Sequence, residues 1–205
     1  MSELHISDAI RYVGVDDTAL DLFESQYPVP NGVSYNAYVI LDEKLAVLDT
    51  VDRRFTAEWL EKLEKVLAGR RPDYLVIHHL EPDHAGSIGA LTERYPEMTL
   101  VASAKALAML PKYFSCPNPT RAVAEGDTLS LGQHSLTFLM APMVHWPEVM
   151  MSYETAEKTL FSADGFGTFG ALGRHRPWLE EARRYYYNIV GKYGAQVQAL
   201  LKKAA

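Results

Sequence analysis

The chain contains a single cysteine, Cys116, among its 205 residues. One thiol cannot build an internal disulfide framework, which excludes the small secreted domains that depend on disulfides for stability. A protein without disulfides is typical of a reducing compartment, so we expect a cytoplasmic protein. Cys116 lies between Ser115 and Pro117, and we interpret it as a loop thiol rather than as a nucleophile.

Long hydrophobic runs are also lacking, because no apolar stretch approaches the roughly 20 residues that a membrane-spanning helix needs. The first residues, Met1 to His5, do not have the basic start and apolar core of a secretory signal peptide. An excess of positive charge is missing too, since the formal net charge is −6. This charge argues against nucleic acid or a membrane surface as the natural partner.

The remaining composition is that of an ordinary globular protein, with 48% hydrophobic and 22% charged residues. A chain of this length can bury a sizeable core, and no linker or repeat interrupts it, so we expect residues 1–205 to form one domain. Hairpin patterns over 34–49 and 126–140 combine with strand–helix alternation over 74–110. This order favours an α/β (α+β) layered sandwich with mixed sheets.

Hydrophobic spacing and turn residues predict the individual elements. Apolar residues recur with helical spacing from Phe55 to Leu67, and Gly69 then gives a helix-ending signal. Alternating and continuous apolar runs predict the strands. We expect strands over 4–15 (ended by a turn at 16–17), 34–41, 45–49, 74–77, 99–102, 135–140, 149–153 and 159–162, and helices over 55–68, 87–94, 103–110 and from 177 to the end.

The densest chemistry follows directly after the expected strand 74–77. Three imidazoles and two carboxylates occur within the seven positions from His78 to His84. Strand ends are where open α/β sheets place their chemistry, and two more polar residues follow other expected strands. Imidazole and carboxylate together suit a pair of divalent iron, manganese or zinc ions. The candidate metal ligands are His79, Glu81, Asp83, His84, His145 and Asp164.

If His145 stood alone, a buried histidine with its hydrogen bonds made would explain it. If Asp164 stood alone, a helix-capping role would explain it. Six potential ligands at strand ends are hard to explain in that way, which favours a metal site. His78 would point to the opposite face of a strand from His79, so we interpret it as structural. The other histidines are treated as surface or packing residues: His5, His134 and His175.

The pattern of these ligands resembles the metallo-β-lactamase-like domain of the flavodiiron proteins, also called A-type flavoproteins. Zinc hydrolases of the same superfamily carry a histidine where this chain has Glu81, which is the specific signal for a non-haem diiron site. The segments 32–38, 144–150 and 161–167 resemble the family's opening hairpin, its His-Trp-Pro segment and its bridging-aspartate loop. The resemblance covers essentially the whole chain and implies a metallo-β-lactamase-like αββα sandwich.

The resemblance also implies roles for individual residues around an oxo- or hydroxo-bridged pair of irons. Trp146 and Met143 would line the pocket, and one of the three tyrosines 185–187, preferably Tyr186, would donate a hydrogen bond to bound oxygen. In some members water displaces the histidine at the position of His84. By position, the first iron would be held by His79, Glu81 and His145, the second by Asp83 and His84, and both by the bridging Asp164.

Two features of the family are missing from this sequence. The family's last histidine ligand, in a Ser/Leu-His-Gly-Pro strand end, would lie beyond Ala205, and the last strand and helix of the fold would be absent with it. Either this sequence is a shortened piece of a longer protein, or fewer protein ligands hold the second iron. A flavodoxin domain is also missing, and the glycine-rich loop 165–173 lacks the lysine and the spacing of a phosphate-binding loop. Flavin mononucleotide (FMN) would therefore act only through a partner domain or protein.

The resemblance implies an oxidoreductase that reduces dioxygen to water, nitric oxide to nitrous oxide, or both. Electrons would come from a flavoprotein or rubredoxin-type partner, and the family favours a homodimer. A second interpretation is an oxygen-binding sensor or carrier that reports to a signalling partner without turnover. A third is a metal-dependent hydrolase of the same superfamily, in which the metals activate water; Glu81 in place of histidine counts against it.

Overall fold

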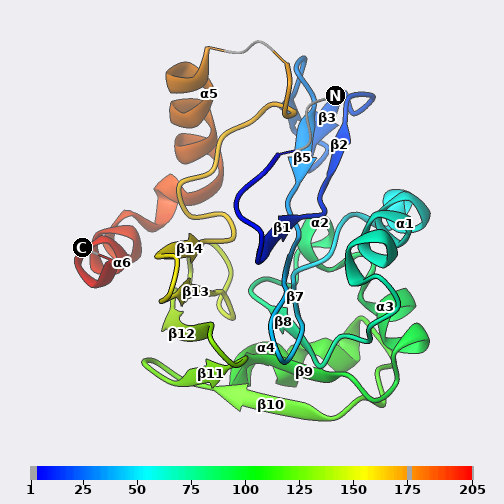
Figure 1. Cartoon of the computed structure of the whole chain (residues 1–205). Helices are drawn as coiled ribbons and strands as arrows, with labels where there is room; N and C mark the ends of the chain where they lie inside the picture. The colour runs from blue at the N-terminus through cyan, green and yellow to red at the C-terminus, as the bar shows by residue number, and fades with distance from the viewer. Residues whose placement is uncertain (1–3, 175–176, 205) are drawn as a thin grey trace.

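Two β-sheets lie face to face in the computed structural model, which describes residues 4–174 and 177–204 (Figure 1). The larger sheet has the strand order β1-β6-β7-β8-β9-β10, with β7 to β10 parallel and β1 and β6 antiparallel to their neighbours. The smaller sheet, β11-β12-β13-β14, is antiparallel throughout, and β2-β5 and β3-β4 form two short ribbons. The strands are β1 Ile10–Tyr12, β2 Val15–Asp17, β3 Leu22–Phe23, β4 Tyr27–Pro28, β5 Val33–Tyr35, β6 Tyr38–Ile40, β7 Ala46–Leu48, β8 Tyr74–Ile77, β9 Thr99–Ser103, β10 Thr120–Val123, β11 Thr128–Ser130, β12 Ser135–Met140, β13 Met150–Glu154 and β14 Thr159–Phe161.

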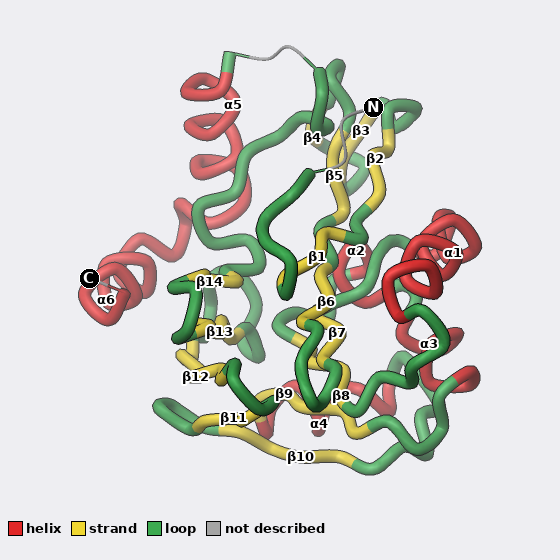
Figure 2. Tube along the Cα trace, in the orientation of Figure 1, coloured by secondary structure: helices red, strands yellow, loops and turns green. Residues whose placement is uncertain are grey.

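Helices form the two outer layers of the molecule. Helices α1 (Thr56–Leu67) and α3 (Ile88–Arg94) lie on the outer side of the larger sheet. Helix α6 (Gly194–Ala204) lies next to the smaller sheet, and α5 (Trp178–Tyr185) lies beyond the end of that sheet (Figure 2). The order helix, sheet, sheet, helix confirms the expected αββα sandwich with mixed sheets. In the part of the chain that the structure describes, none of the helices has the length and apolar character of a membrane span. The shorter helical segments are η1 Arg53–Phe55, α2 Pro82–Ala85, α4 Ala104–Met109, η2 Leu110–Lys112, the π-helical turn η3 Tyr186–Val190 and η4 Gly191–Tyr193.

The strands of the larger sheet bury both of their faces, which explains their nearly continuous apolar sequences. Side chains of Val47, Leu75 and Leu100 belong to a core that also contains Trp59 and Leu63 of α1. The alternate residues of the same strands form a second core with the smaller sheet. The second core contains Ala46, Leu48, Val76 and Val101 from the larger sheet and Leu136, Phe138, Met150 and Phe161 from the smaller one.

Three predicted elements differ from the structure. The strand expected over 34–41 is divided into β5, which pairs with β2, and β6, which belongs to the larger sheet. The strand expected over 4–15 is interrupted, and Asp16 belongs to β2 rather than to a turn, because it pairs with Ser34 of β5 and accepts a 2.6 Å hydrogen bond from its hydroxyl group. The single final helix is broken into α5, η3, η4 and α6. Gly191 and Gly194 lie at the breaks, where the low helix propensity of glycine weakens a continuous helix. The helices predicted over 55–68, 87–94 and 103–110 are confirmed as α1, α3 and α4.

Close packing at Gly86 generates the first prediction. A Cβ atom at Gly86 would lie 2.5 Å from the Arg53 backbone nitrogen and 2.6 Å from the Pro82 carbonyl oxygen, both of which belong to rigid backbone. We expect Gly86→Ala to push α2 away from the segment after β7 and to lower the free energy of unfolding by about 1–3 kcal/mol. Urea denaturation followed by circular dichroism would measure the change.

Gly194→Ala is the matched control, because no atom of the described residues lies within 4 Å of a Cβ placed there. Alanine is a better helix former than glycine, so this variant should be as stable as the parent chain or slightly more stable. Equal stability of Gly86→Ala and the parent chain would contradict the packing argument.

Candidate metal site

The turn after β8 places the first four candidate ligands. β8 ends two residues before His79, and the chain then enters α2 with Glu81 as its N-cap residue. Pro82 occupies the first helical turn, where its fixed φ angle suits a helix start and its missing N–H is not needed. Asp83 and His84 follow within that turn, so one short helix presents both side chains next to His79.

The other two candidates come from distant parts of the chain. His145 lies in the loop between β12 and β13, and Asp164 follows the end of β14. Because the smaller sheet packs on the larger one, these loops lie over the end of β8, and 64 residues separate Glu81 from its contact His145. All six predicted ligands therefore lie together at one edge of the sandwich.

Asp164 lies between two groups of side chains. Its Oδ2 atom is 3.1 Å from His79 Nε2 and 3.4 Å from His145 Nε2. Its Oδ1 atom is 3.2 Å from His84 Nε2. The two oxygen atoms of one carboxylate therefore face different imidazoles, which is the arrangement that a carboxylate bridging two metal ions requires.

Among the described residues, two groups of side chains could each hold a metal ion, and Asp164 belongs to both. Within each group the potential ligand atoms lie within 4.8 Å of one another. All of the side chains are buried except that of Asp83, which is partly exposed. The first group is His79, Glu81, His145 and Asp164, and the second is Asp83, His84 and Asp164.

Several buried polar atoms of the cluster have no hydrogen-bond partner among the described residues, including His79 Nε2, Asp164 Oδ2 and Asp83 Oδ1. His79 Nε2 and Asp164 Oδ2 are only 3.1 Å apart, so distance does not prevent a hydrogen bond between them; they are poorly aligned. Buried polar atoms are normally paired, and atoms that approach one another without pairing suit a shared cation. The imidazole and carboxylate donors of the site thus fit a metal ion such as iron or zinc.

The electrostatics of the site also favour a cation. Burial alone would lower the pKa of the imidazoles, but the carboxylates of Asp164 and Glu81 raise the pKa of His145 to about 9. Burial likewise opposes ionisation of Asp164. The pKa of its carboxyl group is nevertheless held well below the usual range by the charge and hydrogen bonds of the neighbouring imidazoles, those of His84, His145 and His79. For Asp83, burial and the nearby carboxylates raise the pKa to about 7. The site is thus dense in negative charge that positive charge must balance.

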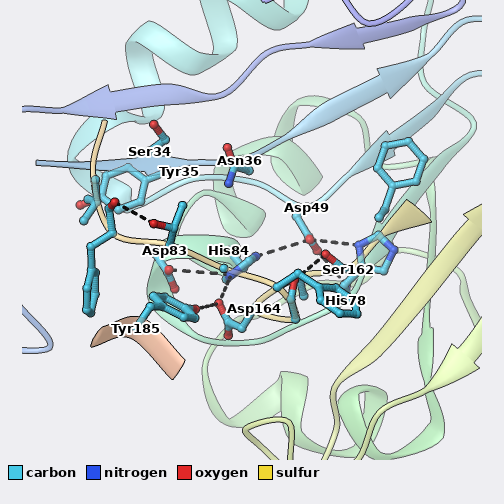
Figure 3. A pocket seen from close by; sticks show the side chains of 18 of the residues that line it. Ser34, Tyr35, Asn36, Asp49, His78, Asp83, His84, Ser162, Asp164 and Tyr185 are labelled. Atoms are coloured by element: carbon cyan, nitrogen blue, oxygen red, sulfur yellow. Dashed lines mark hydrogen bonds and ion pairs between the residues drawn. The ribbon is translucent and has the colours of Figure 1, made fainter. Parts of the chain in front are cut away.

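Glu148 orients one imidazole of the site, and Asp49 lies near another; the sequence analysis selected neither acidic residue. The Nδ1 atom of His79 lies 2.8 Å from Glu148 Oε1, and the Leu80 backbone N–H donates to the same oxygen. Asp49 Oδ2 lies 3.5 Å from His84 Nδ1 (Figure 3). A carboxylate on one ring nitrogen fixes the ring and leaves the other nitrogen free to bind a metal. Asp49 could have been found, because it directly follows β7, the strand next to β8.

His78 does not belong to the cluster. Its Nδ1 atom lies 3.0 Å from Asp49 Oδ2, and its Nε2 atom lies 2.8 Å from Ser152 Oγ. This Ser-His-Asp arrangement has the order of a hydrolytic triad. Ser152 is 0% exposed, however, so no substrate can reach its hydroxyl group, and the three residues connect the two sheets instead.

A cavity of about 240 Å³ borders the cluster, and Asp83, His84, Asp164 and Tyr185 are among the residues that line it (Figure 3). The Tyr185 hydroxyl group donates a 2.6 Å hydrogen bond to Asp164 Oδ1. The structure therefore places Tyr185 against the cluster, whereas the sequence analysis preferred Tyr186, which is 37% exposed. Successive helical side chains point about 100° apart, so only one of them can face the site, and only the fold decides which one.

The residues expected to line the pocket lie in one loop, and neither is among the residues that line the cavity beside the cluster. The Trp146 ring packs edge-on against the His79 ring, with centroids 5.2 Å apart, and Met143 N donates to the Trp146 carbonyl oxygen. Of the histidines interpreted as surface or packing residues, His134 lies 2.9 Å from an Asp42 carboxylate oxygen, and His175 lies outside the described residues.

Known proteins share this chain's sequence and fold. A flavorubredoxin from Vibrio vulnificus, named an anaerobic nitric oxide reductase, is 32% identical over 98% of this chain. The flavodiiron protein of Giardia intestinalis superposes over 100% of the chain with a TM-score of 0.91 and 28% identity. The rubredoxin oxygen:oxidoreductase of Desulfovibrio gigas superposes over 97% with a TM-score of 0.88 and 35% identity.

The chain spans 42% of the length of the Vibrio protein and 52% of each of the two solved chains. A family model described as ODP family beta lactamase matches residues 33–192, which is more than half of the chain. The match includes every candidate ligand and the strands that carry them. The chain belongs to this beta-lactamase-like family, the one that forms the diiron domain of flavodiiron proteins and flavorubredoxins.

Proposed function

We propose that residues 1–205 act as a single non-haem diiron domain that binds and reduces dioxygen, nitric oxide or both. The observation that carries the proposal is the position of Asp164, whose two carboxylate oxygens face His79 and His145 on one side and His84 on the other. A carboxylate in this position supports a site for two metal ions, which the hydrolase interpretation shares, so the two interpretations differ in the metal and its chemistry. The presence of Glu81 within the first group supports iron over zinc, as the sequence pattern predicts.

The residues that would hold the two irons are those that the sequence analysis selected. Iron held by mixed nitrogen and oxygen ligands supplies one-electron redox chemistry and open positions for a small ligand. The first iron would be held by His79, Glu81 and His145, the second by Asp83 and His84, and Asp164 would bridge them.

The surrounding residues would keep these ligands in place and keep the site dry. Glu148 accepts a hydrogen bond from Nδ1 of His79, and Asp49 lies 3.5 Å from Nδ1 of His84. Tyr185 holds a proton on its hydroxyl oxygen and donates it in a hydrogen bond to Asp164 Oδ1; burial beside that carboxylate raises the tyrosine pKa well above its usual value. Trp146 covers the His79 ring and so limits the access of water.

The names of the similar proteins support the substrates and the source of electrons. The Vibrio protein is named a nitric oxide reductase flavorubredoxin, and the Desulfovibrio protein a rubredoxin oxygen:oxidoreductase. We therefore propose both gases as substrates, and an FMN-containing flavoprotein or a rubredoxin-type protein as the electron donor. The homodimer that the family resemblance implies also remains part of the proposal.

Iron content and gas consumption test the function. Protein purified without air should contain about two irons per chain and should change its visible spectrum when air is admitted. With a chemically reduced flavin as donor, it should consume dioxygen or nitric oxide. Iron binding and a spectral change without consumption would favour the sensor. Zinc alone, in protein prepared with iron available, would contradict the diiron proposal and leave the hydrolase.

Glu148 provides a test of the ligand arrangement. Glu148→Gln keeps the size of the side chain but weakens the acceptor that orients His79, so we expect iron to be held about 10–100-fold more weakly. A competition titration with a coloured chelator would measure the affinity. Glu61→Gln on the exposed face of α1 is the control and should bind iron like the parent chain. Equal affinities of all three proteins would rule out an orienting role for Glu148.

Tyr185 provides a test of which of the three tyrosines 185–187 contacts the site. Tyr185→Phe removes a hydrogen bond to a buried carboxylate, and we expect a loss of about 1.5–3 kcal/mol in the free energy of unfolding. Tyr187→Phe should cause no measurable change, because Tyr187 is 76% exposed. Thermal unfolding of the metal-loaded proteins would show the difference, and similar stabilities for the two variants would refute the assignment of Tyr185 to the site.

A further inference from the structure

Asp49 lies between two histidines, one inside the cluster and one outside it (Figure 3). Its Oδ2 atom is 3.0 Å from Nδ1 of His78 and 3.5 Å from Nδ1 of His84. The residue is 6% exposed and follows β7 in a left-handed conformation, with φ of 55°. One carboxylate oxygen thus faces the imidazole of a candidate ligand and the imidazole of a residue that belongs to neither group of ligands.

His78 contacts both oxygen atoms of this carboxylate. Its backbone N–H donates a 2.7 Å hydrogen bond to Asp49 Oδ1, and its ring nitrogen Nδ1 lies 3.0 Å from Oδ2. Two contacts from one residue fix the plane of a carboxylate, whereas a single contact leaves it free to turn about the remaining bond. The orientation of Asp49 therefore depends on the His78 ring.

The smaller sheet holds the other side of the His78 ring. Nε2 of this ring lies 2.8 Å from the Ser152 hydroxyl oxygen on β13, 74 residues away in the sequence. Because a carboxylate only accepts hydrogen bonds, Nδ1 of His78 donates to Asp49, and in the neutral ring Nε2 accepts from Ser152. Ser152 is 0% exposed and lies on the same face of β13 as the core residue Met150. A hydroxyl group at such a buried position needs a partner, and the His78 ring supplies it.

The end of β7 also holds the backbone of His84. Thr50 donates to the His84 carbonyl oxygen through both its backbone N–H and its hydroxyl group, each at 2.8 Å. These contacts leave the rotation of the ring undetermined. Nδ1 of the ring is buried without a hydrogen-bond partner among the described residues, and Asp49 Oδ2 lies 3.5 Å from it. Nε2, on the other side, faces Asp164 within the second group of ligands. The ring orientation therefore depends on where the Asp49 carboxylate is held.

We propose that His78 and Ser152 are positioning residues for the His84 ring. Together they hold the Asp49 carboxylate facing Nδ1 of that ring, which leaves Nε2 directed into the second group of ligands. A carboxylate behind an imidazole restricts the ring and makes its other nitrogen a better ligand. Through this series of contacts, a hydroxyl group of the smaller sheet supports a ligand carried by α2. The inference rests on the proposed metal centre but does not require turnover.

Cobalt(II) titration tests the proposal without measuring activity. Cobalt(II) binds the nitrogen and oxygen donors that also suit iron, and its visible absorption reports the ions that are bound. Metal-free parent protein should take up two cobalt ions in two steps. His84→Asn identifies the step that belongs to the second group, because this variant removes a ligand of that group alone.

Two variants interrupt the contacts at different points. Ser152→Ala removes the donor to the His78 ring, and His78→Gln removes the ring itself. Cobalt should bind the second group about tenfold more weakly in Ser152→Ala and up to about 100-fold more weakly in His78→Gln. Its affinity for the first group should stay unchanged. Ser152→Ala decides the test by itself if His78→Gln does not fold, because it removes a single buried oxygen atom.

A role that only joins the two sheets would give a different result. The first group combines His79, which follows β8, with His145 from the loop between β12 and β13. Looser stacking of the sheets would therefore weaken the first step at least as much as the second. Equal losses in both steps, or a second step as tight as that of the parent chain in Ser152→Ala, would overturn the proposal.

Ser130→Ala is the matched control. Ser130 is an exposed serine of the same sheet, on β11, so its replacement should leave both cobalt steps as they are in the parent chain. A loss of second-step affinity confined to Ser152→Ala and His78→Gln would support the proposal. The same loss in Ser130→Ala would contradict it.

The outcomes also separate this inference from the proposed function. A parent chain that takes up fewer than two cobalt ions would overturn both. Two cobalt steps with the predicted selective loss, in a chain whose iron-loaded form reduces neither gas, would support the roles of His78 and Ser152 and contradict the proposed reductase activity.

Discussion

The buried carboxylate of Asp164 is the constraint on which the rest of the site depends. A carboxylate that is 5% exposed needs positive charge or hydrogen-bond donors close by, because an unpaired buried charge is costly. In this structure three imidazoles and one hydroxyl group meet that need, and they come from α2, the segment before it, the loop after β12 and the end of α5. None of these segments can move without leaving Asp164 uncompensated. The two sheets are therefore joined at this edge by electrostatics as well as by the hydrophobic core.

The fold supports this arrangement by placing every contributor at the end of a rigid element. Parallel strands β7 and β8 end side by side, so Asp49 and His79 emerge at the same edge. The smaller sheet brings His145 and Glu148 over that edge from the loop between β12 and β13. Carboxylates behind the imidazoles restrict ring orientation, which prepares the site for metal ions before they bind and lowers the conformational cost of binding.

Local structure departs from ordinary preferences mainly around the site. Asp49, Met143 and Ala163 all have left-handed backbone conformations, although none is glycine, and each lies within two residues of a candidate ligand or contacts one. Proteins generally satisfy local preferences except where function imposes another demand. The distribution of strain in this chain thus supports a functional site at this edge independently of the identity of the ligands.

The sequence by itself determined the sandwich and the cluster of donors, because both depend on short-range patterns. Helical spacing over 55–68 and apolar runs such as 74–77 reflect burial of one face or of both, and the density of imidazoles and carboxylates from His78 to His84 is visible without a fold. Tertiary structure alone decided that Tyr185 rather than Tyr186 meets Asp164, and that Glu148 supports His79. These contacts join residues distant in the chain, and their geometry depends on how the sheets stack and where the final helix breaks. Hydrophobic periodicity carries no information about either.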